Sequence, residues 1–277
     1  MAFTFKLCTT HDLTSYCNLS ELFIMTQIAH LNPSVKPIWT KVDKWIYRLS
    51  KNWLWIFGVF FGIWIGLPFL PPFFMAMGWE SLANAIYLLY SFQCHQLPQR
   101  SFFFFGSAGM YSISEIQAVW QDTTNPLILR QFIGNPELGW KVAWSDRMVY
   151  MYTSIMVFAG IWWVIRKKVQ PLPWWGLFIL LLPMAVDGTS HLISDFAGIG
   201  QGFRDSNVWL ASLTNNALSP SFYAGDALGS FNSWMRLISG VLFGLGIVWY
   251  CIPYLNKSFS DLAKSLQNKF HRSQSDI

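Results

Sequence analysis

Three stretches of the chain are long, apolar and almost free of charge, and they constrain its fold more than any other feature. They span residues 53–77, 148–165 and 237–255. A bilayer core about 30 Å thick needs roughly 20 apolar residues in a helix to cross it. We therefore predict that each stretch is a transmembrane helix. The prolines at 68, 71 and 72 should end the first one.

The composition and the charge distribution agree with a membrane protein. Charged residues make up 12% of the 277 residues, about half of the ~25% found in soluble domains. This shortage excludes a soluble enzyme, a disordered chain and a small secreted domain held by disulfides. Thirteen of the 19 basic residues lie in 1–52, 166–168 and 257–277, each next to an apolar stretch. That distribution follows the positive-inside rule, and we expect no nucleic-acid partner.

The number of spans depends on two short apolar segments. Residues 173–195 are predicted to be a fourth long span, with a kink at Pro183. Residues 81–93 and 101–113 could form two short spans or one re-entrant hairpin. Because the basic segments at both ends should face the cytoplasm, the number of crossings is even. We predict an all-α transmembrane bundle of about six spans with cytoplasmic N- and C-termini; four spans and a re-entrant hairpin are the alternative.

The chain divides into three parts by composition. We predict that residues 1–52 are a cytoplasmic or interfacial helical extension, that residues 53–256 are the bundle with outer loops at 114–146 and 196–235, and that residues 257–277 are a basic cytoplasmic tail. Within the bundle, Gly240 and Gly244 form a GxxxG face that is typical of helix packing.

The extension is predicted to hold two helices, one ending near Leu31 and one beginning near Ser34. The second is amphipathic and basic, which suits the cytoplasmic lipid surface, although packing on the rest of the protein is equally consistent. Its apolar residues recur every three or four positions, at Ile38, Val42, Trp45 and Leu49.

Ionisable residues inside a span are costly and therefore mark candidate functional sites. Asp187, His191 and Asp195 follow an i, i+4, i+8 spacing, which places them along one face of the fourth span near its outer end. Two carboxylates around an imidazole can hold a divalent metal, relay protons, or act as a base and the group that orients it. The alternative is a helix end that is polar because it emerges into water.

Other charged residues are predicted to reach the same depth. Asp146, Arg147 and Arg236 stand at the outer ends of two neighbouring spans, where pairing with Asp187 or Asp195 would reduce the cost of desolvation. A structural ion-pair cluster and a functional site are both consistent with this placement.

A second polar group surrounds the adjacent residues Cys94 and His95, which are possible metal ligands, with Arg100 nearby. They could complete a site with Asp187 and His191 in the re-entrant arrangement, whereas in six spans they lie too far away. The metal-ligand candidates are therefore Asp187, His191, Cys94, His95 and Asp146. The candidate counter-charges and structural residues are Arg100, Arg147, Arg236 and Asp195.

Residues 94–102, read as Cys-His-Gln-Leu-Pro-Gln-Arg-Ser-Phe, resemble the Cys-His-x-x-Pro-x-Arg-Ser-Phe signature of an uncharacterised family of prokaryotic integral membrane proteins, a domain of unknown function. Residues 187–191 are similar to the family's Asp-Gly-x-x-Gln motif, with His191 in place of the Gln. Where the family has Cys-x-Arg-Cys, this chain has Ser145, Asp146, Arg147 and Met148. If family members bind a metal through cysteine, either Asp146 and His191 substitute as harder ligands in this chain or its site is degenerate. The resemblance implies an architecture and candidate positions, but no reaction.

These observations favour an accessory or structural subunit of a membrane complex. The alternatives are a membrane-embedded metal-binding or proton-relay protein that uses Asp187 and His191, and a transporter of a small solute. The expected partners are the lipid bilayer and other membrane subunits, and the possible cofactor is a divalent transition metal. The expected location is the inner or plasma membrane of a prokaryotic cell, and whether the chain is an enzyme is left open.

Overall fold

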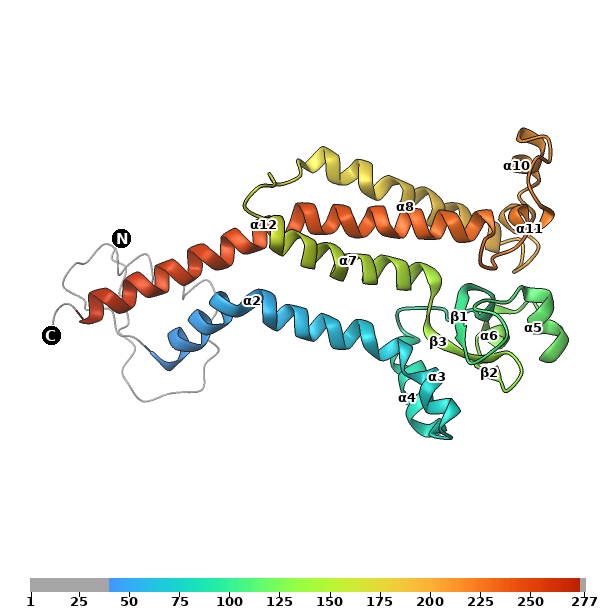
Figure 1. Cartoon of the computed structure of the whole chain (residues 1–277), viewed down its shortest axis with the longest axis horizontal. Coiled ribbons are helices and arrows are strands. Elements are labelled where there is room, and N and C mark those ends of the chain that lie inside the picture. Colours follow the sequence, from blue (N-terminus) through green and yellow to red (C-terminus); the bar gives the residue numbers. More distant parts are fainter. Residues whose placement is uncertain (1–39, 275–277) are drawn as a thin grey trace, which may run out of the picture. The chain divides into compact units, whose positions relative to one another are not determined.

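The computed structural model describes residues 40–274 of the chain (Figure 1). The helix predicted to end near Leu31 and the start of the next one, at Ser34, lie outside the described residues. The chain forms two compact units. The larger unit is Asn52–Phe259, and the described part of the smaller one consists of the chain up to Lys51 and from Ser260 onward.

Within residues 40–274, four helices are long and apolar enough to cross a membrane: α2 (Lys41–Gly66), α7 (Asp146–Ile165), α8 (Trp174–Asp195) and α12 (Phe231–Gln274). They correspond to the four long spans predicted from the sequence. As expected, the prolines end the first span: α2 gives way to the short helix η1 (Leu67–Phe69) and then to α3 (Pro71–Ala76). At most a third of the most apolar window of each span is buried inside the protein, so most of its surface can face lipid.

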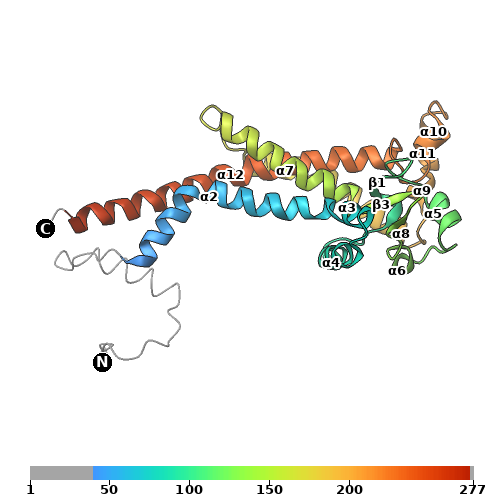
Figure 2. The same ribbon diagram turned by 60° about the horizontal axis from the view of Figure 1, so that its bottom comes forward.

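Within the larger unit, α7 and α12 lie side by side (Figures 1 and 2), and small residues let them approach closely. A methyl group at Gly240 would lie 2.9 Å from Tyr150 Cβ, and one at Gly244 would lie 2.1 Å from Ser154 Oγ. The Ser154 hydroxyl also donates a hydrogen bond to the carbonyl of Gly240, at 3.3 Å. The GxxxG face of α12 therefore packs on α7, as the sequence predicts.

The two short apolar segments do not form a pair of spans. The first is α4 (Glu80–Tyr90), whose 11 residues are too few to cross a bilayer. The second begins with strand β1 (Ser101–Phe104), which pairs antiparallel with β3 (Gly139–Ser145), and β3 also pairs with β2 (Gly134–Asn135). The six-span prediction is therefore not confirmed. The all-α prediction missed this sheet, although the described chain is mostly helical.

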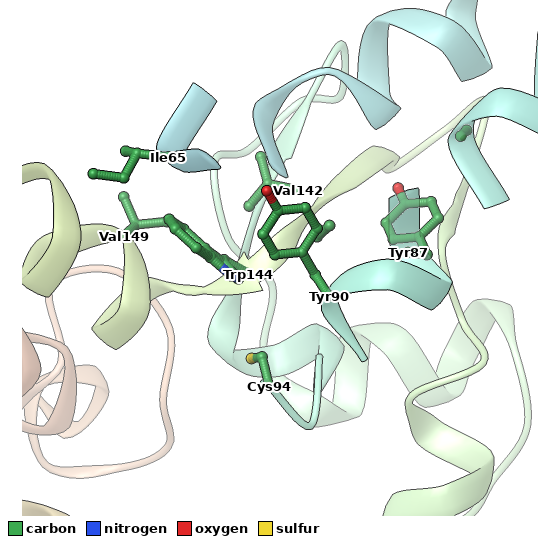
Figure 3. Packing of buried hydrophobic residues seen from close by; sticks show 9 residues of the cluster. Ile65, Tyr87, Tyr90, Cys94, Val142, Trp144 and Val149 are labelled. Carbon is green, nitrogen blue, oxygen red and sulfur yellow. The ribbon is translucent and has the colours of Figure 1, made fainter. Parts of the chain in front are cut away.

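The sheet is fastened to the helices by an aromatic core (Figure 3). Trp144 of β3 is fully buried and meets the ring of Tyr90 edge to face, with 5.4 Å between the ring centroids. The Tyr90 hydroxyl donates to the carbonyl of Trp64, at 2.6 Å, and the Tyr87 hydroxyl donates to the carbonyl of Lys141. Burial raises the pKa of Tyr90 to about 12, so its hydroxyl keeps the proton that it donates. These contacts join α2, α4 and β3.

The remaining helices are short and lie between the spans in the order of the chain. They are η2 (Pro98–Arg100), α5 (Ile113–Val119), α6 (Pro126–Leu129), α9 (Phe203–Ser206), α10 (Val208–Leu213) and α11 (Pro220–Tyr223).

In the smaller unit, the start of α2 and the end of α12 are joined by an ion pair between Lys269 Nζ and Asp43 Oδ2, at 2.9 Å. The apolar stripe predicted for the start of α2 takes no part in this ion pair, and its residues Val42, Trp45 and Leu49 are exposed. The helix therefore contacts protein through Asp43, while the lipid environment of its exposed stripe stays a prediction.

Candidate functional site

A buried network of arginines and aspartates lies in the larger unit, where α7 and α12 begin and α8 ends. It contains four residues of each charge, so its formal charge is zero. Its members are Arg100 of η2, Asp146 and Arg147 of α7, Asp187 and Asp195 of α8, Arg204 of α9, Asp226 of the following loop, and Arg236 of α12.

Arg236 is the most enclosed arginine of the network, with 2% of its side chain exposed. Its Nε donates to Asp146 Oδ2 at 2.6 Å, and its Nη1 donates to Asp226 Oδ1 at 2.6 Å. Its Nη2 donates to the backbone carbonyl of Asp226 at 2.7 Å. The second oxygen of Asp146 accepts from the backbone N–H of Arg147, at 2.7 Å. Arg236 therefore fixes the start of α7 and the loop before α12.

Arg100 links η2 to the same network. Its Nη1 and Nη2 bind the two oxygens of Asp195, both at 2.7 Å, and its Nε donates to Asp226 Oδ2 at 2.7 Å. Burial alone would raise the pKa of Asp226, but the guanidinium groups of Arg100 and Arg236 hold it well below its usual value. Asp226 is therefore ionised and is shared between two arginines.

Asp187 is the carboxylate of α8 that lies deepest in the span. Its Oδ2 accepts from Arg147 Nη2 and its Oδ1 accepts from Arg204 Nη2, both at 2.8 Å. Arg204 also donates to Ser190 Oγ at 2.9 Å and to Asn232 Oδ1 at 3.1 Å, so it ties α8 to α12. Burial of an arginine–carboxylate pair is tolerated when such hydrogen bonds satisfy the remaining groups.

The imidazole of His191 is buried against this pair, with 4% of the residue exposed. Its Nε2 lies 3.3 Å from Arg204 Nη2 and 3.8 Å from Asp187 Oδ1. Because a guanidinium N–H can only donate, Nε2 must accept, and the neutral ring then carries its hydrogen on Nδ1. Nδ1 has no hydrogen-bond partner among residues 40–274.

Cys94 and His95 lie in a different environment. Cys94 is buried at the edge of the aromatic core (Figure 3), where its Sγ accepts from the backbone N–H groups of Gln96 and Ser145 at 3.4 and 3.3 Å. His95 is exposed. Within the described chain, no hydrogen bond or ion pair joins either residue to Asp187 or His191.

The predicted metal ligands are not gathered into one site. No three His, Cys, Asp or Glu side chains among residues 40–274 are grouped so that they could hold a metal ion. All eight carboxylate oxygens of the network accept an N–H at 2.6–2.8 Å. A metal bound at Asp187 or Asp146 would have to displace an arginine, so the metal role stays a prediction. What this geometry does is hold helix ends together.

Sequence reasoning missed Arg204 and Asp226, which both lie in the predicted outer loop 196–235. The candidate charges from the sequence were already balanced, with three arginines and three aspartates (Asp146, Asp187 and Asp195). Their charge balance therefore gave no reason to expect a further arginine or aspartate. One available signal is that Arg204 and Asp226 stand just outside a run of 20 residues without charge, 206–225.

Comparisons with known proteins agree with the membrane assignment. The model of a family described as "Predicted membrane protein (DUF2085)" matches residues 137–250, a range that includes every network residue except Arg100. An uncharacterised protein of Methanocaldococcus jannaschii is 28% identical over 193 residues, which cover 67% of this chain and 81% of that protein. No solved structure matches the chain significantly. The chain is thus similar, over these residues, to a family of predicted membrane proteins and to one uncharacterised protein.

Proposed function

We propose that the chain is an accessory subunit of a complex in the prokaryotic plasma membrane, with four spans and both termini in the cytoplasm. The orientation rests on basic residues. Arg166, Lys167 and Lys168 follow the end of α7 that is opposite the network, and Lys257 lies in the corresponding part of α12. The positive-inside rule then assigns residues 1–52 and 257–277 to the cytoplasm, and the network to the outer side.

The saturation of the Arg–Asp network carries the proposal. Four arginines, of which Arg204 and Arg236 are buried, are neutralised by four aspartates, and every carboxylate oxygen already has a donor. A site that exchanges ions or substrate needs groups whose partners can be replaced at low cost, and removing one partner from a buried ion pair costs about 3–5 kcal/mol. The polar centre therefore favours a rigid junction, and the contribution to a complex then comes from the protein's surface.

The apolar stripe of the smaller unit is the surface that we propose contacts the partner subunit. Val42, Trp45 and Leu49 are 63%, 73% and 41% exposed and follow helical spacing on α2. Lys41 and Lys44 are exposed on the same stretch of helix. An uncovered apolar stripe with a polar rim is typical of interaction surfaces.

The test is purification of the tagged, full-length protein from its native membranes in mild detergent, followed by mass spectrometry. We expect a partner in stoichiometric amount. Replacing Val42, Trp45 and Leu49 by serine should release it, whereas Leu127→Ser, a change of a 66% exposed leucine in α6, should leave it bound. A solitary wild-type protein contradicts the subunit proposal, and a triple variant that keeps its partner contradicts the assignment of the stripe.

One observation favours a second candidate function, a proton relay through His191 and Asp187. The Nδ1–H of His191 is buried and has no hydrogen-bond partner in the described part of the chain, and such a group can exchange a proton with water that reaches it. In that case, proton flux in liposomes containing the purified protein would be lost in His191→Ala and kept in His95→Ala, which changes an exposed histidine. Equal flux in liposomes with and without the protein excludes this candidate.

A further inference from the structure

The loop between α8 and α12 contains a segment of unusual composition. Residues 206–225 include no Asp, Glu, Lys or Arg. The segment forms the short helices α10 and α11, which Figures 1 and 2 show at the end of the bundle where α8 ends and α12 begins. A long extramembrane loop on a protein surface is normally polar and charged, so the absence of charge requires an explanation.

The apolar side chains of this segment point outward. Val208, Trp209, Leu213 and Leu218 are 63%, 47%, 78% and 48% exposed. They lie outside all four candidate spans, so the lipid around those helices does not account for them. Water around so many clustered apolar groups is unfavourable, at about 25 cal/mol for each Å².

The polar groups of the segment, in contrast, hold it in place from inside. Asn207 is fully buried, and its Nδ2 donates to the carbonyls of Arg204 and Tyr223 at 2.6 and 2.8 Å. The Tyr223 hydroxyl contacts Thr214 Oγ1 at 2.5 Å and accepts from the backbone N–H of Leu218 at 3.0 Å. The outward apolar face is therefore a fixed feature of the fold, because the segment is pinned to the loop that carries Arg204.

Exposed apolar residues continue along the chain from α8 into this face. Leu192, Ile193 and Phe196 are exposed at the end of that span, immediately before the loop, and Trp234 is exposed in the first turns of α12. Between Phe196 and Gly225 the chain carries only two charged residues, Arg204, which is buried, and Asp205. This continuity along the chain indicates a lipid environment at this face.

We infer that α10 and α11 form an interfacial anchor that inserts Val208, Trp209 and Leu213 into the lipid leaflet at this end of the bundle. Tryptophan favours the boundary between acyl chains and headgroups, and apolar side chains on short helices bind there by burying area. Because the segment has no charge, zwitterionic and anionic lipids should bind it equally. The anchor would hold the two ends of the segment, and hence Arg204 and Asp226, at the membrane surface.

The inference is tested by a nitroxide label at position 213 of the full-length protein in lipid nanodiscs. The parent has Cys8, Cys17 and Cys251 replaced by alanine and keeps the buried Cys94, and its unlabelled sample gives the background. Leu213→Cys is compared with Glu137→Cys, an exposed charged position in the turn between β2 and β3. Trp209→Cys is a second label site in case Leu213→Cys fails to fold. Collision rates with oxygen, which concentrates in lipid, and with a water-soluble nickel chelate are measured for each label.

We expect the ratio of oxygen to nickel collisions to be roughly tenfold higher at position 213, or at 209, than at 137, because the label sits among acyl chains. The ratio should be the same in phosphatidylcholine and in mixtures with phosphatidylglycerol. A label at 213 that meets nickel as freely as the one at 137 lies in water, which overturns the inference. Low collision rates with both reagents mean that protein covers the face, and that result overturns it as well. A ratio that rises only with anionic lipid contradicts insertion by an uncharged segment.

Discussion

Asp226→Asn is the substitution that should weaken the network most cleanly. The new side chain has nearly the same shape, so the packing is kept while one buried negative charge is removed. Asp226 is 3% exposed and is shared by Arg100 and Arg236, which are 13% and 2% exposed. After the change, the four arginines of the network face three aspartates.

The expected loss of unfolding free energy is about 3 kcal/mol, the low end of the cost of removing one partner from a buried ion pair, because Arg100 keeps Asp195 and Arg236 keeps Asp146. A loss of 1 kcal/mol lowers the melting temperature of a chain of this size class by roughly 2–4 °C. The melting temperature of Asp226→Asn in detergent micelles should therefore fall by about 10 °C. The matched control is Lys269→Gln, which removes an ion pair whose members are 36% and 14% exposed. Exposed pairs contribute about 0–1 kcal/mol, so the control should lose less than ~4 °C.

The acid dependence of stability gives an independent check on the same residue. Because the folded-state pKa of Asp226 is well below the unfolded value of about 3.9, its contribution is complete above pH ~4 and is lost as the pH falls further. The stability of Asp226→Asn should therefore fall less steeply as the pH is lowered, because one fewer carboxylate takes up a proton on unfolding. Equal, small melting shifts in Asp226→Asn and Lys269→Gln would refute the reasoning that the network stabilises the fold.

Two further predictions concern other parts of the larger unit. Gly244→Ala should lower the free energy of unfolding by about 1–3 kcal/mol through overpacking, since the new methyl group meets Ser154 Oγ at 2.1 Å. Gly160→Ala, with no atom within 4 Å of the new methyl group, should be neutral or stabilising. Both are measured by thermal unfolding, and similar losses in the two variants would contradict the packing of α12 on α7. Burial lowers the pKa of Lys141 to about 7, so the unfolded chain binds more protons between pH 7 and 10, and stability should rise by about 2 kcal/mol from pH 7 to 9. That rise should be absent in Lys141→Met, and an unchanged rise in the variant would assign it to another group.

The long spans could be predicted because hydropathy over about 20 residues has few alternative explanations. The short segments could not. A run such as residues 101–105, Ser-Phe-Phe-Phe-Phe, suits a buried strand as well as a helix, and periodicity does not separate the two. The deciding contact is β3, which pairs with β1 across about 40 residues. That distant partner is invisible in a local reading of either segment.

The network illustrates a similar limit. Pairing of Asp187 with Arg147 could be foreseen, because both were predicted to lie at one depth of the bundle. Arg204 and Asp226 could not, since they reach the network through the fold of a loop that has no periodic pattern. Cys94 was a candidate for one site with Asp187. In the structure, Cys94 instead accepts a hydrogen bond from the backbone N–H of Ser145 and packs with the aromatic core beside β3.

Elemental analysis of the protein purified from native membranes tests most directly whether the Arg–Asp network is a closed structural junction. We predict no transition metal in stoichiometric amount in the wild type, and the same result in His191→Ala. One equivalent of zinc, iron, manganese or copper per chain that disappears in His191→Ala would contradict it, because Asp187 and His191 would then hold a metal where the structure has arginines.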